Sequence, residues 1–197
     1  MKKSILKDTL SLVLITLVAA LCLAGVFQLT KNSIAEAEDA ERMDSFKVVF
    51  PDAMDFRDIP AETIAAWNAE HPGAELILGY EALGKSGGDA TGLVLSAVSH
   101  KGYGGDVTLS VGIRNDGTLS GVKVTSMSET SGLGANCTKE EWVAQFKGIK
   151  AESVGYVRDG DPGEGEINAI TSATVTTKAV LEAVNQALAF ALSYMNG

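Results

Sequence analysis

The sequence predicts an α+β protein: a single N-terminal transmembrane helix followed by one domain with a mainly antiparallel sheet and flanking helices. Three observations favour this class: a long uncharged apolar segment near the start, several strand-like segments joined by glycine-containing turns, and helical patterns on both sides of them. The chain has 197 residues, enough for one globular domain and an appendage. We divide it into a cytoplasmic N-terminus (1–8), a transmembrane helix (9–30), a juxtamembrane helical segment (31–72) and an extracytoplasmic domain (73–197).

The apolar segment carries no charge from Thr9 to Thr30, and 16 of these 22 residues are apolar. A helix of that length is about 33 Å long, which crosses a hydrocarbon core of about 30 Å. Three lysines precede it, and the positive-inside rule then places the N-terminus in the cytoplasm and the rest of the chain outside. A cleaved signal peptide would have a shorter apolar region, a lipoprotein signal would need a small residue before Cys22, and a buried core helix is rarely this long. We therefore interpret the segment as a retained membrane anchor.

Two helices are predicted between the anchor and the first strand. The segment 33–50 is rich in Ala and Glu and ends before Pro51. Pro60 begins a second, shorter helix, which ends at the His71-Pro72-Gly73 turn.

Strands follow. The Leu-, Ile- and Val-rich segments 75–82 and 92–99 read as strands joined by a Gly/Ser loop at 84–88. Residues 107–114 alternate apolar and polar, and an Asn115-Asp116-Gly117 turn leads to a return strand from Leu119 to Val124.

The C-terminal third contains helix signals around two short strands. Thr138-Lys139-Glu140-Glu141 has the spacing of a capping box and predicts a helix that begins there. The short strands are expected over 154–157 and 166–170, and the final helix over 175–195. Its apolar stripe predicts the face that packs in the core: Val180, Val184, Leu188, Ala191, Leu192 and Met195.

Charge and composition exclude several classes of protein. The net charge is −9, which divides into +3 for residues 1–31 and −12 for the remainder, so a nucleic-acid partner is not expected. Two histidines cannot form a histidine metal cluster, and we predict neither a metal site nor a catalytic residue. Cys22 lies in the anchor and cannot pair with Cys137, which is then either buried or kept in a compartment poor in oxygen.

Two segments rich in Gly, Ser and Thr stand out. Residues 128–136 follow a strand, and their backbone amides could form a nest for an anion or a planar ligand. Residues 168–177 place four threonines and one serine at the start of the final helix, more hydroxyls than N-capping needs. A phosphate held there, or esterified to Thr174, would be stabilised by free amides and by the helix dipole.

These segments resemble the FMN-binding domain family. Thr171-Ser172-Ala173-Thr174 is similar to its flavinylation motif, and Glu129-Thr130-Ser131-Gly132-Leu133-Gly134 is similar to its Glu-Thr-Pro-Gly-Leu-Gly loop. Gly102-Tyr103-Gly104-Gly105, the Asn115-Asp116-Gly117 turn and Phe50-Pro51-Asp52-Ala53 occur in the family's order. Three positions depart from its pattern, with Asn168 for Asp, Ser172 for Gly and Ser131 for Pro. With the anchor, the resemblance extends over nearly the whole chain to the G subunits of Rnf-type ferredoxin:NAD oxidoreductases.

The resemblance implies an electron-carrying subunit of a redox-driven ion pump, not catalytic alone, with FMN joined to Thr174 by a phosphoester through a flavin transferase. It also implies the A, B, C, D and E subunits of the Rnf complex as membrane partners. The residues it implies around the cofactor are Glu129, Thr130, Gly132, Leu133, Gly134, Thr171, Ser172, Ala173, Thr176, Trp142 and Lys178. Two alternatives stay open: the C subunit of a sodium-pumping NADH:quinone oxidoreductase, and an anchored extracytoplasmic binding or sensory module.

Overall fold

The computed structural model describes residues 2–84 and 88–196, and for residues 2–6, 35, 36 and 38 it describes the backbone alone. Most of the loop predicted at 84–88 lies outside the described residues. The chain forms two compact units, Met1–Met43 and Asp44–Gly197.

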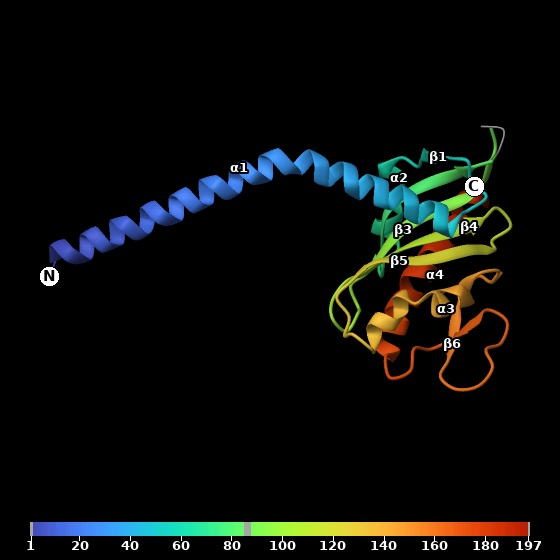
Figure 1. Ribbon diagram of the computed structural model, residues 1–197. Helices are drawn as coiled ribbons and strands as arrows, with labels where there is room; N and C mark the ends of the chain where they lie inside the picture. Colours follow the sequence, from blue (N-terminus) through green and yellow to red (C-terminus); the bar gives the residue numbers. More distant parts are fainter. Residues whose placement is uncertain (1, 85–87, 197) are drawn as a thin grey trace. The chain divides into compact units, whose positions relative to one another are not determined.

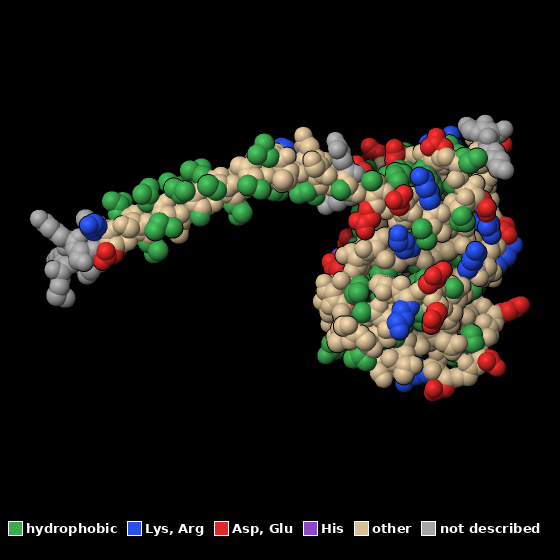
Figure 2. Space-filling view, in the orientation of Figure 1, with side chains coloured by type: hydrophobic (Ala, Val, Ile, Leu, Met, Phe, Trp, Pro, Cys, Tyr) green, Lys and Arg blue, Asp and Glu red, His purple; other side chains and the backbone are tan. Residues whose placement is uncertain are grey.

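The first unit is helical. It contains most of helix α1 (Lys2–Val49), which confirms the helix predicted over 33–50 and the helical state of the predicted anchor. Its apolar window has a mean hydropathy of 2.7 and none of it is buried, so α1 has the length and composition to cross a membrane. Figure 2 shows the hydrophobic side chains along this part of the helix; Leu29, for example, is 83% exposed. A surface this apolar is typical of a helix in contact with lipid.

The second unit is an α+β domain, as predicted. Its main sheet has five antiparallel strands in the order β1-β2-β3-β4-β5. The elements are β1 (Asp55–Asp58), α2 (Ala61–Glu70), β2 (Glu75–Leu83), β3 (Ala90–Ser99), β4 (Val107–Arg114), β5 (Leu119–Met127), η1 (Gly134–Thr138), α3 (Glu140–Val143), η2 (Ala144–Phe146), β6 (Gly155–Val157), β7 (Glu166–Asn168) and α4 (Thr174–Asn196). The four long strands confirm the predicted ones, and 107–114 has the predicted bounds.

The core lies between the sheet and α4, which packs against β2, β3 and β4 (Figure 1). Side chains of a strand alternate between the two faces of a sheet, so Leu109, Val111 and Ile113 share the face that meets α4 and are fully buried. On α4, the predicted stripe is buried from Val180 to Ala191, whereas Leu192 and Met195 are half-buried. Burying each large apolar side chain contributes about 1.5–3 kcal/mol, and this packing positions the start of α4 beside the sheet.

The end of α1 covers the opposite face of the sheet. Gly112 shares that face with Ser110, and a Cβ added at Gly112 would overlap with the Val49 carbonyl oxygen. The Ser45 and Ser110 hydroxyls are 3.0 Å apart and hydrogen-bonded. A side chain at Gly112 would therefore hold the helix off the sheet.

The domain consequently begins earlier than the sequence suggested. Asp44 starts the compact unit, whereas residue 73 was the expected boundary. Part of the expected helical segment 31–72 forms strand β1, which pairs with β2, and α2 also packs on β2. The expected boundary failed because burial of the last turn of α1 depends on glycines that lie far along the chain, and the local pattern does not reveal them.

The helix predicted to begin at Thr138-Lys139-Glu140-Glu141 is present, since α3 begins at Glu140, but the capping box itself does not form. The Thr138 hydroxyl donates to the Ala135 carbonyl oxygen at 2.9 Å and does not cap a helix. No side-chain hydrogen bond caps α3, which has four residues and continues into the short 3₁₀ turn η2. The hydroxyl is already used inside the preceding 3₁₀ turn, so the sequence pattern is present without its hydrogen bonds.

Candidate functional site

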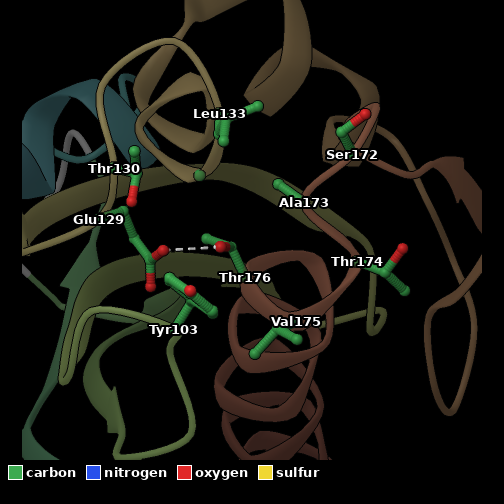
Figure 3. Close-up of a pocket in the computed structure, with 10 residues that line it drawn as sticks. Tyr103, Glu129, Thr130, Leu133, Ser172, Ala173, Thr174, Val175 and Thr176 are labelled. Atoms are coloured by element: carbon green, nitrogen blue, oxygen red, sulfur yellow. Dashed lines mark hydrogen bonds between the residues drawn. The ribbon is translucent and has the colours of Figure 1, made fainter.

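The two segments rich in Gly, Ser and Thr meet in one cleft of about 590 Å³ (Figure 3). One wall comes from the loop after β5, and the other from the residues that lead into α4. A third segment, between β3 and β4, closes one side. The lining residues are Tyr103, Glu129, Thr130, Leu133, Gly134, Ser172, Ala173, Thr174, Val175 and Thr176.

Glu129 joins these segments at the bottom of the cleft. Only 9% of the residue is exposed, and the Thr176 hydroxyl donates to its Oε2 at 2.8 Å. The Gly104 amide donates to Oε1 at 3.2 Å. A Cβ at Gly134 would overlap with Oε2, so glycine is needed for this close approach. The carboxylate thus connects the loop after β5 to α4 and to the 102–105 loop.

Thr174 is the first residue of α4 and lies across the cleft from Glu129 (Figure 3). The amides of Thr174, Val175 and Thr176 open the helix, and no described residue accepts a hydrogen bond from them. Thr177, in contrast, is used structurally: its amide donates to the Ala173 carbonyl, and its hydroxyl accepts from the Ile170 amide at 3.0 Å. The helix start therefore keeps donors for an anion at Thr174.

The other glycine-rich loop has less donor capacity than the sequence suggested. The amides of Leu133 and Ala135 both donate to the Thr130 carbonyl oxygen, and the Asn136 amide donates to Leu133. These bonds close the turn that leads into η1. Part of the nest expected in 128–136 is thus occupied by the loop's own carbonyls, and this segment also contributes side chains to the cleft.

Four of the expected cofactor residues lie outside the cleft. Gly132 forms the turn with a φ of 76°, and Lys178 is exposed further along α4. Trp142 is 8% exposed, and its Nε1 donates to the Asn168 carbonyl oxygen at 2.8 Å, so it packs in the core. Thr171 lines a smaller neighbouring hollow of about 160 Å³, together with Arg158 and Thr174.

The cleft also contains two residues that the sequence did not single out, Tyr103 and Val175. Tyr103 belongs to a Gly-Tyr-Gly-Gly segment that the resemblance already placed in order, and this was the available signal. Asn168, at the position where the motif usually has Asp, lines neither hollow. Its amide donates to Gln145 Oε1 at 2.8 Å and its carbonyl accepts from Trp142, so its backbone fixes the approach to the motif.

Ser172 has a φ of 60°, a left-handed conformation that no other described non-glycine residue adopts. A side chain in this region costs roughly 1–2 kcal/mol, and glycine avoids that cost. The departure from the glycine of the family motif is therefore a source of strain beside Thr174.

We expect Ser172→Gly to raise the free energy of unfolding by about 1 kcal/mol, because the strain is relieved. The free energy of unfolding is measured by urea unfolding of the full chain in detergent, monitored by circular dichroism. Ser153→Gly is the matched control: Ser153 is exposed and does not have a positive φ, so stability should stay equal or fall. A fall in stability for Ser172→Gly would contradict the assignment of strain.

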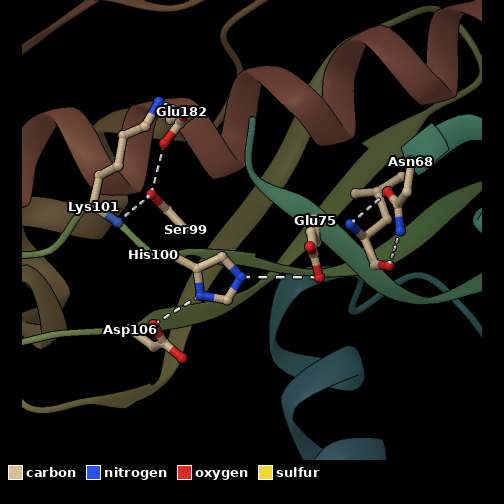
Figure 4. A network of polar contacts seen from close by, with 8 residues as sticks. Asn68, Glu75, Ser99, His100, Lys101, Asp106 and Glu182 are labelled. Carbon is tan, nitrogen blue, oxygen red and sulfur yellow. Dashed lines mark hydrogen bonds and ion pairs between the residues drawn. The ribbon is translucent and has the colours of Figure 1, made fainter. Parts of the chain in front are cut away.

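Polar contacts hold both ends of the 100–106 segment, which carries Tyr103 (Figure 4). Lys101 Nζ donates to Glu182 Oε1 on α4 at 2.5 Å, and the Ser99 hydroxyl donates to Glu182 Oε2 at 2.8 Å. His100 Nδ1 lies 2.8 Å from Asp106 Oδ1 across the neck of the loop, and its Nε2 lies 3.9 Å from Glu75. Hydrogen bonding to Asp106 is the main reason that the pKa of His100 lies above its usual 6.5.

The His100 contacts predict a pH dependence. Because the pKa is raised in the folded state, the stabilisation is complete below pH 6.5 and is lost as pH rises through the raised pKa. We expect an NMR titration to give His100 a pKa above 6.5, and Asp106→Asn to move it back toward that value. Asp161→Asn, at an exposed position, is the control. An unchanged His100 pKa in Asp106→Asn would contradict this.

Cys137 is fully buried, which decides between the two states expected for it. Burial, with the nearby charge of Glu129, raises the pKa of its thiol to about 11. The thiol is therefore protonated at neutral pH and a poor nucleophile.

Comparison with known proteins shows the family. A family model of an FMN-binding domain matches residues 102–189, and a model of the RnfG N-terminal region matches residues 1–49. The chain is 35% identical over 191 residues to the G subunit of the Na⁺-translocating ferredoxin:NAD⁺ oxidoreductase complex of Acetobacterium woodii, covering 94% of this chain and 91% of that protein. The chain belongs to the Rnf G-subunit family.

Other relatives agree with this membership. The Rnf G-subunit chain is 29% identical over 196 residues to the G subunit of the proton-translocating ferredoxin:NAD⁺ oxidoreductase complex of Clostridium ljungdahlii, covering 100% of this chain and 96% of that one. Its fold is similar to that of the C subunit of the Na⁺-translocating NADH-quinone reductase of Parabacteroides distasonis, with a TM-score of 0.55, 18% identity, and coverage of 74% and 79%. That likeness concerns the fold.

The residues present in this Rnf G-subunit chain fit FMN. The cleft volume of about 590 Å³ lies within the roughly 300–1,000 Å³ typical of small-molecule sites. Apolar groups of Leu133, Ala173 and Val175 offer surface for a ring system. Amides without an acceptor among the described residues lie at the start of α4, together with the Thr174 hydroxyl, and such groups can bind a phosphate.

Proposed function

We propose that the chain is the electron-carrying flavoprotein subunit of an Rnf-type membrane complex that couples electron transfer from ferredoxin to NAD⁺ with ion transport. Membership of the Rnf G-subunit family carries this proposal, because relatives that match almost end to end are named as subunits of such complexes. The FMN-binding domain match supports the cofactor. FMN supplies the redox chemistry when bound; the chain's residues hold and orient it.

The second part of the proposal is that FMN is attached to Thr174 through a phosphoester. The Thr174 hydroxyl oxygen would attack the FMN phosphorus of a flavin dinucleotide donor, in a reaction carried out by a separate flavin transferase. The new P–O ester bond forms as the pyrophosphate bond of the donor breaks, the nucleoside monophosphate leaves, and the hydroxyl proton passes to a base. The remaining phosphodiester charge would lie at the N-terminus of α4, where the amides of Thr174, Val175 and Thr176 have no acceptor among the described residues. A tether of this kind keeps the local concentration of the cofactor high for partners in the same membrane.

The remaining cleft residues have complementary roles in this proposal. Leu133, Ala173 and Val175 pack against the flavin ring, and Thr130 offers its hydroxyl to the polar atoms of the ring. Ser172 and Thr171 lie next to the phosphate, with Arg158 in the same hollow as Thr171. Glu129 keeps the three segments together.

Attachment is tested on the full chain produced together with an active flavin transferase. We expect intact mass to show one added FMN, and peptide mapping to place it on Thr174. Thr174→Ala should remove it completely, whereas Thr125→Ala, a control at an exposed threonine outside both hollows, should keep it. FMN retained in Thr174→Ala, or none in the wild type while a known substrate is modified, would refute the attachment.

For the membrane topology, we propose that α1 spans the membrane once, with residues 1–8 in the cytoplasm and the FMN domain outside. The apolar window and the lysines before it support this orientation. A cysteine introduced at exposed Glu152 should react with a membrane-impermeant maleimide in intact cells. If this cysteine reacted only after the cells were lysed, the domain would lie in the cytoplasm and the proposed orientation would be wrong. The expected partners are the other membrane subunits, A to E, of the same complex.

A further inference from the structure

Tyr103 is unusual among the aromatic residues of the domain because its side chain is exposed. It is 76% exposed, whereas Tyr80 is 9% exposed and Tyr194 is partly buried with a hydrogen bond to Glu81. It is also the aromatic residue among those that line the cleft. A large ring left in water at the edge of a cleft lined by apolar groups offers surface for a ligand.

The backbone that carries Tyr103 is held in place. The Gly104 amide donates to the buried Glu129 carboxylate, and a Cβ at Gly104 would overlap with the Ser128 carbonyl oxygen. Lys101 is paired with Glu182, and His100 with Asp106. The side chain of Tyr103 is thus presented by a fixed loop and is free of packing, an arrangement that lowers the entropy lost when it contacts a ligand.

Tyr103 and Leu133 lie on two sides of the cleft. Figure 3 shows Tyr103 and Leu133 on opposite sides of the hydrogen bond between Glu129 and Thr176. Leu133 is 43% exposed. An aromatic ring and a branched aliphatic side chain on two sides of one cleft suit a flat, aromatic ligand.

We propose that Tyr103 is a cofactor-binding residue whose phenol ring stacks on the isoalloxazine ring of FMN, with Leu133 on the other side of the cleft. This inference rests on the proposed function, since it takes FMN as the ligand of the cleft. Tyr103 acts on the ring end of the cofactor and Thr174 on its phosphate. Loss of the Tyr103 ring should therefore change the environment of the flavin without changing its attachment.

The test uses the flavinylated full chain and three variants: Tyr103→Phe, Tyr103→Leu and the control Ile77→Ala, an exposed apolar position on β2 outside the cleft. Tyrosine in contact with an excited flavin donates an electron to it, and the electron returns without emission of light. The wild type should therefore be weakly fluorescent with a short lifetime. Both Tyr103 variants should become several-fold brighter, and Ile77→Ala should match the wild type.

Polarised fluorescence separates stacking from quenching. Tyr103→Phe keeps an aromatic ring and should keep the flavin as immobile as in the wild type, whereas Tyr103→Leu should release it. Aromatic pairs shift a stacking equilibrium by roughly two- to tenfold, so the mobile fraction should grow by a comparable factor. Because Tyr103 is exposed, neither substitution should unfold the domain.

The outcomes distinguish this inference from the proposed function. Intact mass reports attachment independently of fluorescence: one FMN per chain in every variant, with unchanged lifetime and mobility in Tyr103→Leu, overturns the stacking role alone. If no chain carries FMN, the attachment fails, and the same fluorescence measurements with free FMN at saturating concentration still decide on Tyr103. Brightening in Tyr103→Leu under either condition supports the inference.

Discussion

Glu129→Ala is expected to disrupt the cleft and to lower the free energy of unfolding of the domain by about 2–4 kcal/mol. Removal of the carboxylate leaves the Gly104 amide and the Thr176 hydroxyl without their acceptor, and each group left unsatisfied costs roughly 1–3 kcal/mol. The loop with Tyr103 and the first turn of α4 lose their common anchor. Flavin attachment at Thr174 should fall as well, since the motif is then less ordered.

Two variants separate this role from charge and from surface effects. Glu129→Gln keeps an oxygen for the Gly104 amide, and the Thr176 hydroxyl can then accept from its amide group, so most of the stability should return. Glu141→Ala removes an exposed carboxylate and should have little effect. Urea unfolding gives the free energies, and hydrogen exchange at the Gly104 amide reports the loop. Exchange at Gly104 as slow in Glu129→Ala as in the wild type would contradict the anchoring role.

The second large effect is expected for Gly112→Ala, which should destabilise the domain by about 2–3 kcal/mol. The new methyl group would overlap with the Val49 carbonyl oxygen, so the last turn of α1 must move off the sheet. Phe46 and Phe50, at most 1% exposed, would then lose part of their burial. The midpoint of thermal unfolding should fall by roughly 5–10 °C for a domain of this size.

The matched control is Gly155→Ala, where the nearest atom to the new methyl, Glu166 Cγ, is at an ordinary 3.4 Å. That variant should change the midpoint by little. Hydrogen exchange over residues 44–50 should accelerate in Gly112→Ala and stay slow in the control. If Gly112→Ala were as stable as the wild type, the packing of the last turn of α1 would not depend on the absence of a side chain at Gly112.

Local patterns predicted most elements of the domain because their signals lie within a few residues. The alternation of Val107, Leu109 and Val111, followed by an Asn-Asp-Gly turn, defines a hairpin without reference to the rest of the chain. The final helix was equally clear from its apolar stripe. The capping box at Thr138 does not form, although its residue types are right. The reason is that the Thr138 hydroxyl donates to the nearby Ala135 carbonyl oxygen.

The candidate site was only partly visible in the sequence. Glu129 and the Thr171-Ser172-Ala173-Thr174 motif were identified, and the cleft contains Glu129, Ser172, Ala173 and Thr174. The resemblance implied that Trp142 lies near the cofactor, yet its indole nitrogen donates to the Asn168 carbonyl oxygen inside the core. Tyr103 was overlooked because its segment is separated from Glu129 by a complete hairpin, and only strand pairing brings the two together.

By itself, the sequence determined an apolar helix with the length to span a membrane, an acidic α+β domain, and a hydroxyl-rich helix start suited to a phosphate. Each of these features depends on residues that are close together in the chain. The tertiary structure alone decided that the domain begins at Asp44, that Ser172 is strained, and that Tyr103, Glu129 and Thr176 share one cleft. These three features depend on contacts between residues far apart in the chain. Such contacts arise when β-pairing and the burial of α4 bring the segments together.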